Sequence, residues 1–300
     1  MPTVALDTLI DLPWGQLLVN GLALGSLYAL TAFGIVLIYK TTQVITFAQG
    51  ETAMFSTFVA FTLLTAFQLP FVVAFALTLL FAGLFGALIE RVVLRRISMT
   101  SILNPVIVTV GLSLILVGTA GWIWGYEIRT FPAPVDGPPF RVGTIVVSQL
   151  NALTFAVTLV LMTVLFAFFR YAPTGIAMRA VAQNRTAAQL MGISINRMNA
   201  LGWGMGTAMG AVTGMLIAPL NYLDPGMMGD VALKAFAGAV VGGLTSLPGA
   251  VVGGLLLGII DSVVGFEVPA LRNTIAFALI VLVLVIRPAG LLGKHEIKKV

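Results

Sequence analysis

The sequence contains little charge and no cysteine. Charged residues make up 9% of its 300 residues, compared with about 25% in soluble proteins, while 59% of the chain is apolar. So few charges cannot cover the apolar surface of a soluble fold of this size, which excludes that class. The absence of cysteine excludes disulfides, thiolate nucleophiles and sulfur-bound metals. The single histidine, His295, stands in a charged tail, so we expect neither a His-based triad nor a metal site.

Long apolar runs are the main feature of the remaining sequence. Crossing a lipid core of about 30 Å takes about 20 helical residues, and helices pair their own backbone polar groups in lipid. The runs therefore predict an all-α polytopic membrane protein in a single domain, residues 1–300, with eight to ten transmembrane helices. The predicted spans lie near 16–39, 52–68, 70–90, 103–125, 149–169, 198–218, 232–246, 248–264 and 268–286. Tight turns are expected at 68–70 and 245–249.

The basic residues divide unevenly between the two sides of this bundle. If the spans alternate, twelve of the sixteen Lys and Arg fall on one side, which the positive-inside rule assigns to the cytoplasm together with the C-terminus. The net charge of +5 then follows from topology, and we expect no nucleic-acid partner. No Lys or Arg precedes Lys40, so we expect an outer N-terminus, no signal peptide, and a first apolar segment that stays in the mature protein.

Two polar segments are long enough to carry structure of their own. On the outer side, 127–148 is rich in proline and then alternates from Phe140 to Val147, which predicts a turn and a short strand or a small hairpin, with an ordinary loop as the alternative. On the inner side, 171–196 contains a predicted short amphipathic helix from Arg179 to Ile193, ended by Gly192. Such a helix can bind in a groove of a soluble partner, although it can equally lie on the surface without one.

Glycines recur at a spacing that indicates close helix packing. Residues every four positions share one helix face, and small residues there let helix backbones approach in lipid. The predicted packing residues are Gly202, Gly206, Gly210 and Gly214 in one span, and Gly238 and Gly242 in the next. The four-glycine stripe predicts contact with another helix, either of this chain or of a partner.

Two polar, glycine-bearing stretches interrupt the apolar sequence, at 41–52 and 221–230. The first follows an inward span and the second an outward span. Interrupted segments in oppositely oriented halves are typical of an inverted repeat with broken helices and a transport path between the halves, while two surface loops are the alternative. The candidate path residues are Tyr28, Gln49, Gly50, Glu51, Tyr222 and Asp224.

Few groups could drive transport or catalysis. Asp230 and Lys234 are four residues apart, as in a helix-face ion pair, and carboxylates within the spans are too scarce for a typical ion-coupled transporter. The stretch 288–295 lacks the first glycine of a phosphate loop and the Ser or Thr that follows its lysine. We therefore expect no ATP site in this chain, no enzymatic activity and an external energy source. The sequence contains no nucleophile–base arrangement, which argues against the third possibility, an intramembrane enzyme or assembly factor.

The inner segment carries a family resemblance. Thr186-Ala187-Ala188-x-x-x-Gly192 is similar to the EAA-x-x-x-G coupling motif of bacterial ABC importer permeases, with Thr in place of Glu. Over nearly the whole chain, an ordered set of motifs resembles the high-affinity branched-chain amino acid (LIV-type) ABC transporter permease family, first permease subunit. The set comprises 20–30, 45–51, 175–193, 234–236, 242–254 and 287–293. Thr46 and Gln49 stand where the family commonly has Asn and His.

The resemblance implies one transmembrane permease domain in the bacterial cytoplasmic (inner) membrane. It implies a second related permease, two cytosolic ATPase subunits that bind ATP and Mg²⁺, a periplasmic or extracellular substrate-binding protein, and contact with membrane lipid. The residues implied in coupling to the ATPases are Arg179, Ala182, Arg185, Ala187, Ala188 and Gly192. The substrate would be a branched-chain or other small hydrophobic amino acid, with urea or another small amide as the alternative. A self-sufficient secondary transporter or channel is the competing hypothesis.

Overall fold

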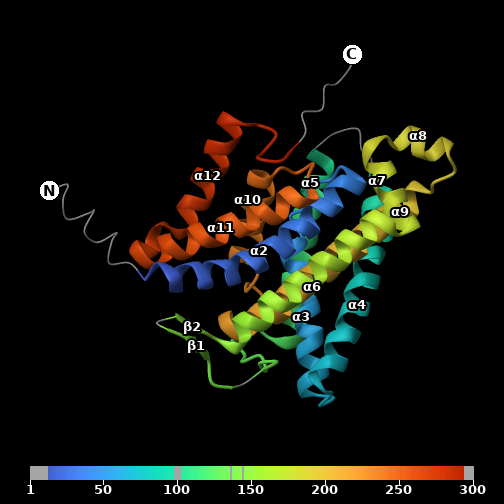
Figure 1. Ribbon diagram of the computed structural model, residues 1–300. Helices are drawn as coiled ribbons and strands as arrows, with labels where there is room; N and C mark the ends of the chain where they lie inside the picture. Colours follow the sequence, from blue (N-terminus) through green and yellow to red (C-terminus); the bar gives the residue numbers. More distant parts are fainter. Residues whose placement is uncertain (1–12, 98–102, 136, 144, 294–300) are drawn as a thin grey trace.

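The computed structural model of the chain is almost entirely helical (Figure 1). It describes residues 13–97, 103–135, 137–143 and 145–293, so the C-terminal tail with His295 lies outside the described residues. The elements are α2 (Trp14–Thr42), α3 (Gln49–Thr65), α4 (Phe71–Val92), η1 (Leu94–Arg96), α5 (Leu103–Trp124), β1 (Phe140–Val142), β2 (Ile145–Val147), α6 (Gln149–Tyr171), α7 (Pro173–Gln183), α8 (Arg185–Leu190), α9 (Ile195–Asn221), α10 (Gly229–Gly242), α11 (Leu247–Glu267), η2 (Pro269–Leu271) and α12 (Arg272–Ile286).

Each predicted span corresponds to a helix. Within the described ranges, seven helices are long and apolar enough to cross a membrane, namely α2, α4, α5, α6, α9, α11 and α12 with the short turn before it. The other two, α3 and α10, have 17 and 14 residues and are shorter than a full span. The all-α polytopic membrane fold is therefore confirmed, and the two short helices are those that follow the polar breaks.

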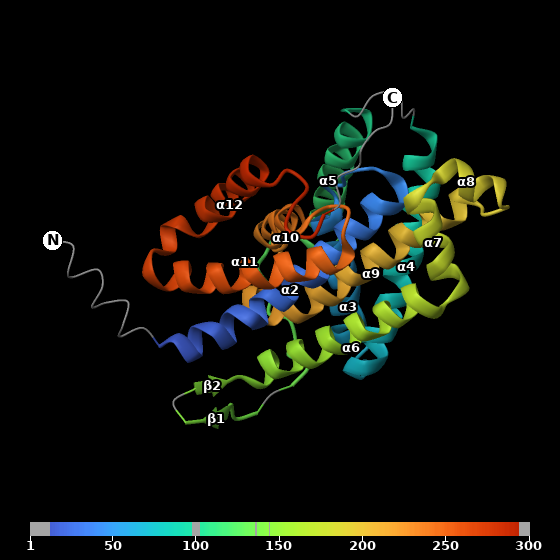
Figure 2. The same ribbon diagram turned by 45° about the horizontal axis from the view of Figure 1, so that its top comes forward.

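Eight of the described helices form two interlocking halves of four, α2–α5 and α9–α12, and α6 packs on α2 beside them. α2 and α9 cross antiparallel at the centre, where Thr31 Oγ1 lies 3.0 Å from Thr213 Oγ1 and Gly34 lies against Gly206. α2 packs most extensively on α11 while α9 packs on α4, so the first helix of each half contacts the third helix of the other. Figure 2 shows α2 lying between α11 and α9. α3 likewise packs on α9 and α10 on α2, which is the pairing expected of an inverted repeat.

Glycines make these contacts possible. A Cβ atom on Gly258 would overlap the backbone of Gly25, so α2 and α11 meet backbone to backbone. The predicted packing glycines all lie at contacts within this chain: Gly202 and Gly206 against α2, Gly210 and Gly214 against α3, and Gly238 and Gly242 against α11.

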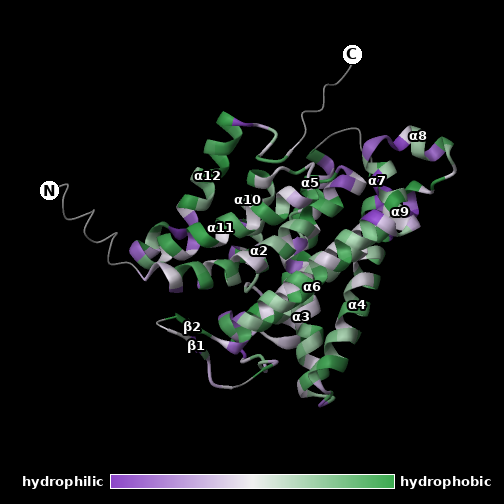
Figure 3. Cartoon of the chain, in the orientation of Figure 1, coloured by the Kyte–Doolittle hydropathy of each residue, from purple (hydrophilic) through white to green (hydrophobic). Residues whose placement is uncertain are grey.

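One end of the bundle, called here the basic end, collects the end of α2, the end of α4, α7, α8, the start of α9 and the turn after α10. Lys40 Nζ donates to the Thr245 carbonyl at 3.0 Å, and Arg95 Nη2 donates to the Asn196 carbonyl at 3.1 Å. Hydrophilic residues gather at α7, α8 and the start of α9 in Figure 3. The helix ends and the inner segment that the positive-inside rule assigns to one side are thus neighbours in space.

The opposite end, called here the hairpin end, carries β1 and β2. The two strands pair antiparallel with Phe140 opposite Val147, which confirms the hairpin predicted within 127–148. Gln16 at the start of α2 exchanges hydrogen bonds of 2.9 and 2.8 Å with the backbone of Val146. The hairpin is therefore fixed to the first helix of the bundle.

The inner segment differs from the single helix predicted over 179–193. It forms two helices, α7 and α8, which meet at Asn184. The Asn184 side chain accepts a hydrogen bond of 2.9 Å from the Ala187 amide and caps α8, so the chain turns there. Gly192 ends this unit with a φ of 82°, the left-handed conformation expected of it.

Candidate functional site

The two polar breaks meet inside the bundle. Gln49 Nε2, on the first residue of α3, donates to the Gly206 carbonyl at 2.7 Å, and Gln49 also lies against Gly34. Gly34 precedes the end of α2 by eight residues, so α3 begins about 12 Å inside the basic end. The segment between α2 and α3 therefore re-enters the bundle before the helix starts.

The start of α10 reaches the same depth from the other side. A Cβ atom on Gly50 would lie 2.8 Å from the Ala232 Cβ and 3.4 Å from the Met228 carbonyl. From this point α3 runs to the hairpin end and α10 to the basic end. Neither helix has a side-chain cap at its start, so two positive helix ends lie side by side at membrane depth.

Both short helices keep one stripe partly exposed, here called the open stripes. On α3 the stripe is Glu51, Phe55 and Val59, at the i, i+4 spacing of one helix face. On α10 it includes Leu233 and Phe236, and the exposed Gly229 and Asp230 lie at the start of the same helix. The rings of Phe47 and Phe236 are 5.9 Å apart and join the two stripes. Polar and charged groups at this depth are accommodated against protein or water rather than lipid.

The predicted path residues divide into three groups. Gln49, Gly50 and Glu51 lie together at the start of α3, as described above. Tyr28 is buried on α2. Tyr222, which is 55% exposed, and Asp224 belong to the connection between α9 and α10, where Asp224 Oδ1 accepts from the Gly226 amide at 2.6 Å.

The connection after α9 is held in an unusual conformation. Tyr222 has φ 62° and ψ 169°, a region that costs a non-glycine residue about 1–3 kcal/mol. The next residue, Leu223, exchanges backbone hydrogen bonds of 3.0 and 2.8 Å with Arg129 of the outer loop. The outer loop therefore clamps the break that leads into α10.

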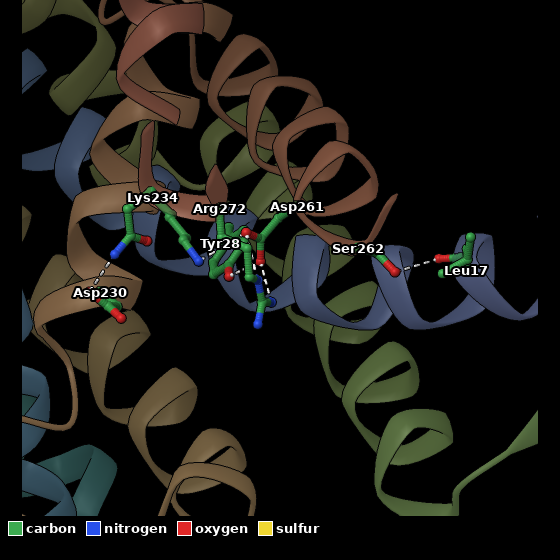
Figure 4. A network of polar contacts seen from close by, with 8 residues as sticks. Leu17, Tyr28, Asp230, Lys234, Asp261, Ser262 and Arg272 are labelled. Atoms are coloured by element: carbon green, nitrogen blue, oxygen red, sulfur yellow. Dashed lines mark hydrogen bonds and ion pairs between the residues drawn. The ribbon is translucent and has the colours of Figure 1, made fainter. Parts of the chain in front are cut away.

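A buried ion network lies beside the start of α10 (Figure 4). Asp261 on α11 accepts from three groups: Lys234 Nζ at 2.9 Å, Arg272 Nη2 at 2.7 Å and Tyr28 Oη at 3.0 Å. Lys234 thus forms its ion pair with Asp261 and not with Asp230, the partner expected from the i, i+4 spacing. Asp230 Oδ1 instead accepts a hydrogen bond from Asn273 Nδ2 at 3.4 Å. Tertiary packing decides this because α11 brings a carboxylate to the buried side of α10. The network joins α2, α10, α11 and α12.

The α7–α8 unit forms a second surface of interest, outside the spanning helices. Leu190 and Met191 are 84% and 83% exposed, although they are large apolar side chains. Arg179, Ala187 and Gly192 are also exposed. These residues could contact a partner without rearrangement of the chain. The sequence alone did not single out Leu190 and Met191 as exposed, although two apolar residues beside a helix-ending glycine in a polar segment are a usable signal.

The remaining predicted coupling residues face the protein. Ala188 is 4% exposed and Ala182 is partly buried. The Arg185 guanidinium lies 3.4 Å from both the Thr42 carbonyl and Asn199 Oδ1, and partial burial lowers the pKa of Arg185. Arg185 thus links α8 to the end of α2 and to α9, whereas Arg179 is exposed.

A comparison with known proteins places this architecture in a family. The family model of the branched-chain amino acid transport system permease component matches residues 17–284. The chain belongs to this family. The permease is 34% identical to the high-affinity branched-chain amino acid transport system permease protein BraD of Pseudomonas aeruginosa, over 95% of this chain and 97% of BraD. It is 32% identical to the Escherichia coli protein LivH of the same description, with the same coverage.

An archaeal relative extends the comparison. The permease is 29% identical to the probable branched-chain amino acid transport permease protein LivH of Methanocaldococcus jannaschii, over 94% of each chain. The resemblance inferred from the ordered motifs is therefore confirmed. Membership in a permease-component family also favours a transporter subunit over an intramembrane enzyme and over a transporter that works alone.

Proposed function

We propose that this permease is one of two related membrane subunits of an ATP-driven importer that carries branched-chain or other small hydrophobic amino acids into the cell. The substrate class is taken from the descriptions of BraD and LivH. The second subunit would cover the open stripes of α3 and α10, and the path would run between them. The start of α3, with Gln49, Gly50 and Glu51, would border it.

The observation that carries the ATP-driven part is the exposed apolar pair Leu190 and Met191. The exposure of large apolar side chains to water is unfavourable, so such a patch outside the spanning helices marks a surface that a partner protein covers. Two cytosolic ATPase subunits, which bind ATP and Mg²⁺, would receive α8 in a groove, one under each permease. Closure of the ATPase pair would then move the helices through α7 and α8.

The remaining assignments follow from this orientation. The basic end would face the cytoplasm of a bacterial cell, in agreement with the positive-inside rule, and the C-terminus would lie there too. The hairpin end would receive a substrate-binding protein on the outer side. Lipid would surround the exposed faces of α4, α5 and α6.

The test replaces Leu190 and Met191 together by Asp. In the proposed importer, this variant loses ATPase chains on purification and loses ATP-driven leucine uptake by at least about tenfold, because two charges replace an apolar contact. Phe140→Asp is the matched control: it places a charge on an apolar side chain that is 56% exposed at the opposite end, and it keeps the ATPase chains. Retention of ATPase chains and uptake by the double variant would contradict the proposal, as would ion-driven uptake by the permease alone.

A further inference from the structure

Glu51 has a carboxylate with no partner for one of its oxygens. Its Oε2 atom is covered and has no hydrogen-bond partner within the described part of the chain. The other buried acids differ, since Glu90 pairs with Arg95 at 2.6 Å and Asp261 with two cations. A desolvated carboxylate oxygen without a donor is unfavourable, so it calls for an explanation.

The direction of the Glu51 side chain follows from its neighbours. The preceding residue, Gly50, faces α10. One turn further on, Phe55 stacks on Phe85 of α4 at 5.3 Å and meets Trp124 of α5 edge-on at 5.4 Å. Because successive helix residues are about 100° apart, Glu51 points between α10 and α5. These two helices do not pack extensively on one another within the described residues, and Glu51 as a whole stays partly exposed.

The surroundings of the carboxylate are apolar and aromatic. Phe47, two residues before α3, is 45% exposed and contacts Phe236 of α10, and Phe55 follows Glu51 one turn along α3. An acceptor oxygen beside an aromatic wall suits a ligand with a cationic N–H donor attached to an apolar body, because the cation pairs with the carboxylate and the body contacts the rings.

We propose that Glu51 binds the α-ammonium group of the amino acid during its passage, with Phe47 and Phe236 in contact with its side chain. This inference rests on the proposed function, because it names the group of the substrate that one residue recognises. The ammonium supplies the donor that Glu51 Oε2 lacks. The start of α3 places the carboxylate in a favourable helix-end field, but this field supplies no partner for that oxygen.

The experiment uses the complete transporter purified from its membrane without the substrate-binding protein. Thermal unfolding is followed with L-leucine, with 3-methylbutylamine, which lacks the carboxylate, and with 4-methylpentanoate, which lacks the amine. We expect leucine and the amine to raise the Tm of the wild type by about 3 °C at saturation, and 4-methylpentanoate to leave it unchanged. Glu51→Gln, which keeps the shape, loses both responses, and Glu51→Asp keeps part of them.

Glu267→Gln is the matched control, because it removes the same charge from an exposed position at the hairpin end and keeps the wild-type responses. Responses of Glu51→Gln equal to the wild type would overturn the inference. Stabilisation of the wild type by 4-methylpentanoate equal to that by L-leucine would also overturn it. So would an equal stabilisation by sodium chloride that Glu51→Gln abolishes, because this would indicate a metal-ion site.

ATP-driven leucine uptake separates this inference from the proposed function. With the binding protein added back, Glu51→Gln lowers the maximal uptake rate at least about tenfold while ATPase chains still co-purify, since α8 is untouched. A wild type without ATP-driven uptake refutes the proposed function. Wild-type uptake that Glu51→Gln leaves unchanged refutes the role of Glu51 alone.

Discussion

The ion network around Asp261 predicts that one of its members is far more important for stability than the others. Asp261→Asn leaves the Lys234 ammonium without a counter-ion while its side chain is only 6% exposed. An uncompensated buried charge of this kind costs about 3–5 kcal/mol. Arg272 loses the same partner, but its side chain is 40% exposed and can turn toward water. At roughly 2 °C per kcal/mol for a large domain, the Tm falls by about 6–10 °C.

The cation variants act differently because Asp261 keeps partners in each. In Lys234→Met, Arg272 and Tyr28 still donate to the carboxylate, so we expect a loss of about 1 kcal/mol. The double variant Lys234→Met with Asp261→Asn removes both buried charges and recovers most of the stability. Unfolding of the purified permease in mixed detergent micelles, followed by circular dichroism, measures all three. Equal losses in the two single variants, or an additive double variant, would refute this account of the network.

Three further predictions concern the backbone. Gly258→Ala forces a Cβ atom into Gly25 and lowers the free energy of unfolding by about 1–3 kcal/mol. The control Gly118→Ala has open space around it among the described residues and changes that free energy by no more than about 0.5 kcal/mol. Equal effects of the two variants in thermal melts would contradict the close helix contact. Asn184→Ala removes the α8 cap, costs about 1 kcal/mol locally and speeds hydrogen exchange at 185–192 but not in α7. Tyr222→Gly relieves the left-handed strain and raises the free energy of unfolding by about 1 kcal/mol in the same micelle assay, whereas a loss would show that the tyrosine side chain outweighs the strain.

Much of the fold follows from local sequence. Each long apolar run predicted from the sequence corresponds to a helix among the described residues, because lipid forces a continuous apolar stretch into one helix. The alternation from Phe140 to Val147 likewise gave the hairpin. Glycine spacing indicated which faces pack, since Gly206 and Gly210 do contact other helices. These features depend on residues close together in the chain, where periodicity is informative.

The site was harder to predict because its contacts join distant parts of the chain. The i, i+4 rule favours Asp230 as the partner of Lys234, but the carboxylate that pairs with it comes from α11. The depth at which α3 starts is set by the contact of Gln49 with α9, which no local pattern contains. The break at Asn184 has a local cause, an N-cap side chain, that could have been recognised.

The exchange of partners between the two halves has a mechanical consequence for the proposed importer. α2 packs on α11 and α9 packs on α4. Separating the halves would therefore break the closest helix contacts among the described residues. The chain is therefore expected to move as one rigid body on its side of the transport path. The opening and closing that transport needs would then occur at the interface with a neighbouring subunit. Each polypeptide would form only one of the two surfaces that line the path there.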